Sequence, residues 1–187
     1  DNVRPWAKCP ARDFTLRNLH HEKEGADQKV DIALQGPLSR EILLDLDISQ
    51  QDIQKISNLS RTNLCHIEWK GQDVIISRTG YTGEKMAFEI FIHPEKTENL
   101  WEELINIGAP LGLLPCGLGA RDSLRTEAGL PLYEHEMGGK FNLGVADAGF
   151  ASFVKLHKPW FIGRDAFIKK EEVRSSKLIR FCFEDQR

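Results

Sequence analysis

Four short stretches of the chain carry the apolar or alternating pattern expected of strands. They are Val30–Leu34, Leu64–Trp69, Val74–Ser77 and Phe88–Ile92. The second and third are separated by Gly71, Gln72 and Asp73, a short polar turn that is typical of a hairpin. The pattern therefore predicts strands that pair in antiparallel fashion.

Apolar residues spaced three and four positions apart predict helices elsewhere. These helices are expected over residues 39–46, with Ser39 as the N-cap, over 94–108 and over 165–172. Further strands are expected over 153–156 and 178–183. Because antiparallel strand pairs alternate with helices, the expected fold class is α+β, with helices packed on antiparallel sheets.

The segment 117–133 predicts one more helix, which ends at a glycine followed by a proline. Arg121 and Arg125 lie four positions apart and therefore share one face of this helix. Two like charges stacked in this way repel each other and need an anionic partner. Asp122 and Glu127 are available nearby, so an ion-pair network on the helix surface and a ligand-facing arginine are both open.

Composition excludes several classes of function. The 187 residues are 41% hydrophobic, which is enough for a packed core. The net charge of −3 argues against a nucleic-acid-binding surface, which needs a basic excess. No apolar run reaches the roughly 18 residues that span a bilayer, so no membrane association is expected. The first residues contain no apolar core of a signal peptide.

The four cysteines, Cys9, Cys65, Cys116 and Cys182, lie far apart and form no C-x-x-C motif. They are expected to be buried thiols in a reducing compartment. No cysteine or histidine cluster has the spacing of a zinc site, so no metal is predicted.

Four blocks in order resemble the aminomethyltransferase family, which includes the T-protein of the glycine cleavage system. They are Leu34-Gln35-Gly36-Pro37, the turn S-R-T-G-Y-T-G-E with F-E-I over 77–90, A-R-D-S-L-R-T-E-A-G-L-P-L-Y over 120–133, and F-I-G-R-D over 161–165. The resemblance covers residues 30–187. It implies a T-protein-like folate-binding domain over 1–173, with its N-terminal portion missing, and the first strand of a C-terminal β-barrel within 174–187.

The resemblance also implies a function and a ligand site. Family members transfer a one-carbon unit from an aminomethyl group to tetrahydrofolate, whose pterin N–H groups suit a carboxylate acceptor. Glu89 matches the family's pterin-binding carboxylate, Tyr81 its neighbouring tyrosine and Arg121 the arginine that reaches the folate region. Tyr133 is expected either to line the folate channel or to pack in the core.

The catalytic aspartate of the family comes from a G-G-x-x-D-D segment that has no match here. The catalytic residue is therefore unassigned. Both ends of the chain read as those of a piece of a longer protein, which is expected to bind folate weakly and not to catalyse on its own.

Two alternatives stay open beside an aminomethyltransferase fragment. One is the folate-binding module of a larger dehydrogenase or demethylase of the dimethylglycine or sarcosine type, and the other is a non-catalytic folate-binding relative. The partners that the resemblance implies are folate and an aminomethyl-lipoyl carrier protein. The expected location is the cytoplasm, or the mitochondrial matrix in a eukaryote.

Overall fold

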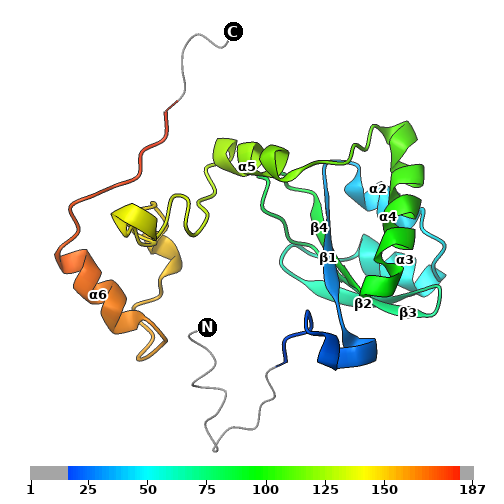
Figure 1. Ribbon diagram of the computed structural model, residues 1–187, viewed down its shortest axis with the longest axis horizontal. Coiled ribbons are helices and arrows are strands. Elements are labelled where there is room, and N and C mark those ends of the chain that lie inside the picture. The colour runs from blue at the N-terminus through cyan, green and yellow to red at the C-terminus, as the bar shows by residue number, and fades with distance from the viewer. Residues whose placement is uncertain (1–16, 182–187) are drawn as a thin grey trace, which may run out of the picture. The chain divides into compact units, whose positions relative to one another are not determined.

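The computed structural model describes residues 17–181, which form two compact units, 17–128 and 129–181 (Figure 1). The first unit contains a four-stranded antiparallel sheet with helices packed on it. The α+β class predicted from the sequence is thereby confirmed.

The sheet has the strand order β1-β4-β3-β2. Its strands are β1 (Val30–Gln35), β2 (Leu64–Trp69), β3 (Gln72–Ser77) and β4 (Ala87–Ile92). Lys70 and Gly71 join β2 to β3, with φ angles of 49° and 75°. Positive φ at both central residues marks the type I′ turn, whose twist matches that of a hairpin. The turn therefore lies before the predicted position, and β3 begins at Gln72.

The helices of the first unit are α2 (Ser39–Leu44), α3 (Gln50–Ser57), α4 (Pro94–Gly108) and α5 (Leu118–Glu127), with 3-10 turns η1 (Glu22–Asp27) and η2 (Ala109–Leu111). The prediction that Ser39 caps α2 is wrong, because Leu38 occupies the cap position. The Ser39 hydroxyl instead donates to the carbonyl oxygen of Met86, at 3.2 Å. It thereby ties α2 to the residue just before β4.

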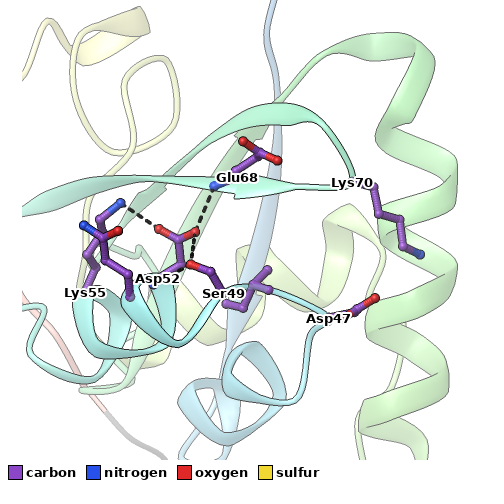
Figure 2. Close-up of a pocket in the computed structure, with 8 residues that line it drawn as sticks. Asp47, Ser49, Asp52, Lys55, Glu68 and Lys70 are labelled. Atoms are coloured by element: carbon purple, nitrogen blue, oxygen red, sulfur yellow. Dashed lines mark hydrogen bonds and ion pairs between the residues drawn. The ribbon is translucent and has the colours of Figure 1, made fainter.

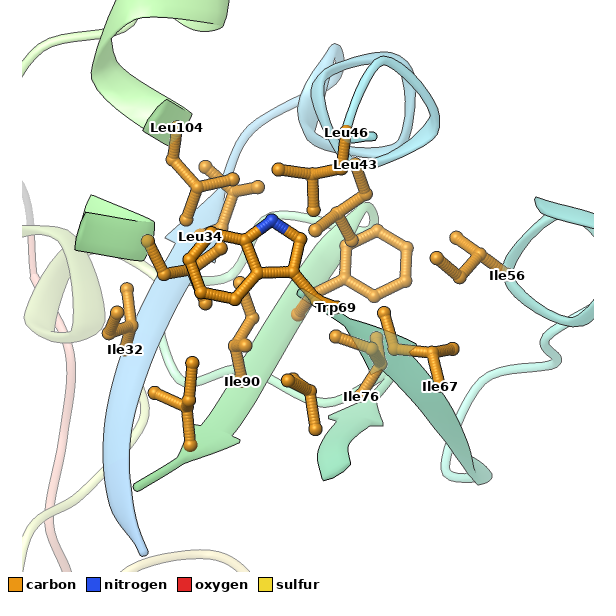
Figure 3. Close-up of a cluster of buried hydrophobic side chains, with 14 of the residues drawn as sticks. Ile32, Leu34, Leu43, Leu46, Ile56, Ile67, Trp69, Ile76, Ile90 and Leu104 are labelled. Carbon is orange, nitrogen blue, oxygen red and sulfur yellow. The ribbon is translucent and has the colours of Figure 1, made fainter. Parts of the chain in front are cut away.

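One face of the sheet is buried beneath α2, α3 and α4 (Figure 1). Trp69 lies among the aliphatic side chains of this core (Figure 3) and is 1% exposed. Its indole nitrogen donates to Glu103 of α4, at 3.3 Å, so the buried ring keeps a polar partner. Alternate residues of β1, β3 and β4 complete the core, as the period of two predicts: Ile32, Leu34, Val74, Ile76, Phe88, Ile90 and Ile92.

The second unit consists of loops with η3 (Gly139–Phe141), η4 (Ala151–Phe153) and α6 (Arg164–Glu172). Buried Asp147 organises it by accepting a hydrogen bond from the Gly144 amide, at 2.7 Å. Lys170 of α6 lies 3.7 Å from the same carboxylate. Helix α6 was predicted, and the prediction is confirmed.

Two predicted strands are not found in the described part of this unit. The prediction of a strand over 153–156 is wrong, because the chain there forms the end of η4 and then irregular backbone. Residues 178–181 carry no strand, and the remainder of the segment 178–183 lies outside the described residues.

The cysteine prediction is corrected in part. Cys65 is half-buried, whereas Cys116 is exposed and not the buried thiol expected. Cys9 and Cys182 lie outside the described residues. Among residues 17–181, no helix combines the length and apolarity needed to cross a bilayer.

Candidate functional site

The face of the sheet opposite the core carries polar side chains. Alternation along the strands directs Asp31 of β1, Ser77 of β3 and Glu89 of β4 to this face. Asp31 is exposed, and Ser77 and Glu89 are half-buried. Partial burial of a carboxylate costs desolvation free energy that a fully solvated carboxylate does not lose. Such groups are common at functional sites, so this face is the candidate site.

Glu89 is held by the hydroxyl group of Thr79, which lies two residues after the end of β3. It pairs across the sheet with Ser77 on one side and Ala33 on the other. The Thr79 hydroxyl donates to Glu89 Oε2, and Thr79 lies 2.9 Å from the Ser77 hydroxyl. Within the described residues, the other oxygen, Oε1, has no hydrogen-bond partner. The carboxylate is thus oriented by Thr79 through one oxygen, and its other oxygen is not hydrogen-bonded to any described residue.

Asp31 is a second carboxyl on the same face. It pairs with Phe91 of β4, two residues from Glu89, and so lies diagonally from Glu89 across the two strands. Burial raises the pKa of Asp31, and repulsion by Glu89 raises it further. Arg121 and His20 act in the opposite direction and partly offset this increase. The sequence showed an acid between two apolar residues here, but nothing in it indicated the link to Glu89.

The two arginines of α5 have different environments. Arg125 is buried, and its Nε donates to Asp122 Oδ1 at 2.8 Å, so the internal ion pair left open by the sequence is formed. Arg121 is exposed and acts electrostatically on Asp31. Arg121 is therefore the arginine whose charge reaches the polar face of the sheet.

Tyr81 lies half-buried in the loop between β3 and β4. This loop packs on the end of β1, because Thr82 donates to Gln35 Oε1 at 3.0 Å. A Cβ atom added at Gly80 would meet the Gln35 amide and lie 2.5 Å from Ala87 Cβ. The loop can approach the strand this closely only with glycine at that position. Two motif blocks that are distant in the sequence therefore meet at one end of the sheet.

Glu84 lies in the same loop and has a structural role. Its Oε1 accepts hydrogen bonds from the backbone amides of Lys85 and Met86, at 2.7 and 3.1 Å. Tyr133, the fourth predicted site residue, belongs to the second unit. Its side chain is exposed, and its ring edge lies against the backbone of Gly138.

A polar groove of about 590 Å³ lies beside the start of α3 (Figure 2). Asp52 is its centre and accepts hydrogen bonds from the Ser49 hydroxyl at 2.9 Å, Lys55 Nζ at 2.6 Å and the Glu68 amide at 3.3 Å. Burial alone would raise the pKa of Asp52, but these partners outweigh it and lower the pKa. Because the hydrogen bonds of Asp52 are made to residues of α3 and β2, we interpret this carboxylate as a structural link between the two elements.

Among residues 17–181, no group of three or more histidine, cysteine, aspartate or glutamate side chains is arranged to hold an ion.

Comparison with known proteins places these features in a family. A profile of the family described as GCVT N-terminal domain matches residues 12–158. The chain is 41% identical over 180 residues to the aminomethyltransferase of Alkaliphilus oremlandii, covering 91% of this chain and 46% of that protein. The aminomethyltransferase of Thermoanaerobacter sp. is 41% identical over 157 residues, 83% of this chain and 41% of that protein.

A third relative extends the match. The aminomethyltransferase of Clostridium botulinum is 44% identical over 179 residues, 94% of this chain and 45% of that protein. The chain thus spans less than half the length of each of these curated relatives.

Proposed function

Because this chain belongs to the GCVT N-terminal domain family, we propose that it forms part of a tetrahydrofolate-dependent aminomethyltransferase. The whole protein would move a one-carbon unit from an aminomethyl group to tetrahydrofolate. The names of the relatives favour this function over the folate-binding module of a larger dehydrogenase or demethylase.

The observation that carries the proposal is the state of Glu89. One carboxylate oxygen is held by Thr79, and the other has no partner within the described residues. A pterin presents ring N–H and amino donors side by side, and a fixed carboxylate is the acceptor that suits them. The residues present therefore fit a reduced pterin.

Three further side chains are proposed to contact the ligand. Arg121 would contribute positive charge towards the acidic part of a folate, and its electrostatic effect on Asp31 supports this role. Tyr81 would contribute an aromatic wall from the loop before β4. Tyr133 would line the folate channel, which its exposed ring supports better than packing in the core.

Binding and orientation are the tasks of these residues. Tetrahydrofolate, when bound, supplies the amine nitrogen that accepts the one-carbon unit. Glu89 would hold the pterin edge, and the Thr79 hydroxyl would keep the carboxylate from rotating. No residue is assigned to proton transfer, because the family's aspartate segment has no match in this chain.

The proposal extends to organisation and partners. Residues 1–173 would contribute to the folate-binding domain, and 174–187 would begin a C-terminal β-barrel. An aminomethyl-lipoyl carrier protein would deliver the one-carbon unit. The protein would work in the cytoplasm, or in the mitochondrial matrix if its source is a eukaryote.

The experiment is a calorimetric titration of the chain with tetrahydrofolate. Glu89→Ala should weaken binding by about 2–5 kcal/mol, since donors of the ligand lose their acceptor. Glu84→Ala is the matched control, because that carboxylate is occupied by backbone amides, and it should bind nearly as the unaltered chain does. Equal losses in the two variants would refute the assignment of Glu89.

A further inference from the structure

Four basic side chains gather where the β3–β4 loop passes the end of α3. Arg61, Arg78 and Lys85 line a small pocket of about 110 Å³, together with the side chains of Thr62 and Thr79. The fourth is Arg40 of α2, which lies beside Arg78 because both side chains donate hydrogen bonds to the same carbonyl oxygen. A pocket of this size admits a single small polar group.

The fourth side chain, Arg40, and Arg78 converge on one carbonyl oxygen. Arg40 Nη2 lies 3.1 Å and Arg78 Nη1 3.0 Å from the oxygen of Leu59. Burial lowers the pKa of Arg40, and repulsion by Arg78 lowers it further. Two guanidinium groups are therefore held together against their mutual repulsion.

Apart from the Leu59 carbonyl oxygen, these cations have few acceptors among the described residues. The Nε atoms of Arg40 and Arg78 are both buried without a hydrogen-bond partner. Within residues 17–181, no carboxylate forms an ion pair with Arg40, Arg61, Arg78 or Lys85. Glu84 borders the pocket, but its Oε1 is already taken by two backbone amides.

Several other basic side chains of the same unit do pair with acids. Lys29 lies 3.5 Å from Asp73, Lys55 lies 2.6 Å from Asp52, and Lys70 and Arg125 pair with Glu103 and Asp122. The hydrogen bonds to the Leu59 carbonyl oxygen account for one N–H donor of Arg40 and one of Arg78. They leave unexplained why Arg61 and Lys85 also line the pocket, where Glu84 is the one acid and forms no ion pair with them among the described residues.

We propose that this cationic pocket binds a small oxoanion, either a free phosphate-type ion or a carboxylate group of a larger acidic ligand. Guanidinium groups recognise such oxygens through paired N–H donors, and the lysine ammonium group adds further donors. Thr79 lines the pocket while its hydroxyl binds Glu89, so the anion site adjoins the pterin site without sharing its carboxylate.

The test is a titration of the whole chain, without folate, with inorganic phosphate and separately with a triglutamate peptide. Nuclear magnetic resonance would follow the arginine Nε–H signals and the backbone amides. Saturable shifts are expected at Arg78, with a dissociation constant of about 1 mM or tighter for at least one probe. Saturation by phosphate identifies a free ion as the ligand, and tighter binding of the peptide identifies a carboxylate.

The variants Arg61→Gln and Lys85→Gln remove exposed side chains and should leave the fold intact. Each should weaken binding of the preferred probe by about fivefold or more. Lys96→Gln, an exposed position of α4 outside the pocket, should leave the titration unchanged. Shifts that do not saturate, or pocket variants that titrate as Lys96→Gln does, would overturn the proposal. Arg78→Lys, which keeps the charge but loses the paired donors, should also bind more weakly.

Discussion

The two faces of the four-stranded sheet differ in almost every physical respect although the same strands build both. Ile90 is fully buried against the helices, whereas the adjacent Glu89 is half-buried and has one carboxylate oxygen with no hydrogen bond to residues 17–181. Each step along β4 alternates between the two environments. One face thus contributes stability through apolar burial, and the other carries the polar groups that we propose to bind a ligand.

The comparison teaches that tolerance to substitution should follow the face rather than the position along the strand. A residue in the core loses contacts when it is shortened, while a residue on the polar face changes binding and leaves the core intact. Adjacent residues of one strand can therefore have opposite phenotypes.

Ile90→Ala should have the largest effect. Ile90 is 0% exposed, so its truncation leaves a cavity and should lower the free energy of unfolding by about 2–5 kcal/mol. Urea denaturation followed by tryptophan fluorescence measures the change. Glu89→Ala, next to it in sequence, should change stability by less than about 1 kcal/mol. Equal destabilisation by both variants would contradict the claim that only one face of the sheet contributes to the stability of the core.

Gly80→Ala should have the next largest effect. The added Cβ would lie 2.5 Å from Ala87 Cβ and would also collide with the Gln35 amide, so the β3–β4 loop would have to move. Such overpacking costs about 1–3 kcal/mol and should displace Tyr81 as well.

The matched control is Gly119→Ala, inside α5, where an added Cβ meets no atom within 4 Å. This substitution should stabilise the chain by about 0.5–1 kcal/mol, because alanine favours the helix. Thermal unfolding of the two variants in parallel decides the matter, and a neutral Gly80→Ala would contradict the close approach of the loop.

Thr79→Val should have a smaller effect, confined to the polar face. It removes the hydroxyl that orients Glu89 and should weaken tetrahydrofolate binding about fivefold, or ~1 kcal/mol. Thr97→Val, at the start of α4 and away from Glu89, serves as the control. Calorimetry should show the loss for Thr79→Val alone.

The smallest effect is a difference in pH dependence between two aspartates. The folded pKa of Asp31 is raised above its ordinary value of 3.8, and that of Asp52 is lowered below it. Ionised Asp31 therefore weakens the folded state at neutral pH, and this penalty disappears as pH falls through the folded pKa towards 3.8. Ionised Asp52 stabilises the folded state above pH 3.8, and this contribution is lost as pH falls through its folded pKa.

Asp31→Asn should accordingly raise the melting temperature slightly at pH 7 and leave it unchanged below pH 3.8. Asp52→Asn should lower the melting temperature at pH 7, with a difference that shrinks at acidic pH. Melting curves of the two variants at both pH values test the signs, and a shift in the same direction for both at pH 7 would be inconsistent with the opposite environments.

Local pattern was sufficient for much of the fold. Alternation alone predicted β2 with its observed bounds, because pairing with β3 through a tight turn is a local event. Helix spacing likewise predicted α6. The Ser39 cap was mispredicted because the hydroxyl finds its acceptor at Met86, far along the chain. A rule for helix caps that uses only neighbouring residues cannot predict a hydrogen bond to such a distant carbonyl group.

The candidate site was predictable only in part, for the same reason. The motif identified Glu89, but the hydroxyl that holds it depends on the β3–β4 register. Asp31 lay within the predicted strand over 30–34, yet its coupling to Glu89 requires the pairing of β1 with β4. The pairing of Arg125 with Asp122 was foreseeable, since it lies within one helical turn.

The strand order also sets a sequence of events in folding. The β2–β3 hairpin closes over two residues, while β1 pairs with β4 only after the whole intervening chain has been enclosed, as the partners Val30 and Ile92 show. Closing a long loop costs more entropy and is slower than closing a hairpin. As an edge strand with a single neighbour, β1 should dock last and exchange its amide protons first. The lifetime of the contact between Asp31 of β1 and Glu89 of β4 is then governed by detachment of β1 rather than by melting of the core.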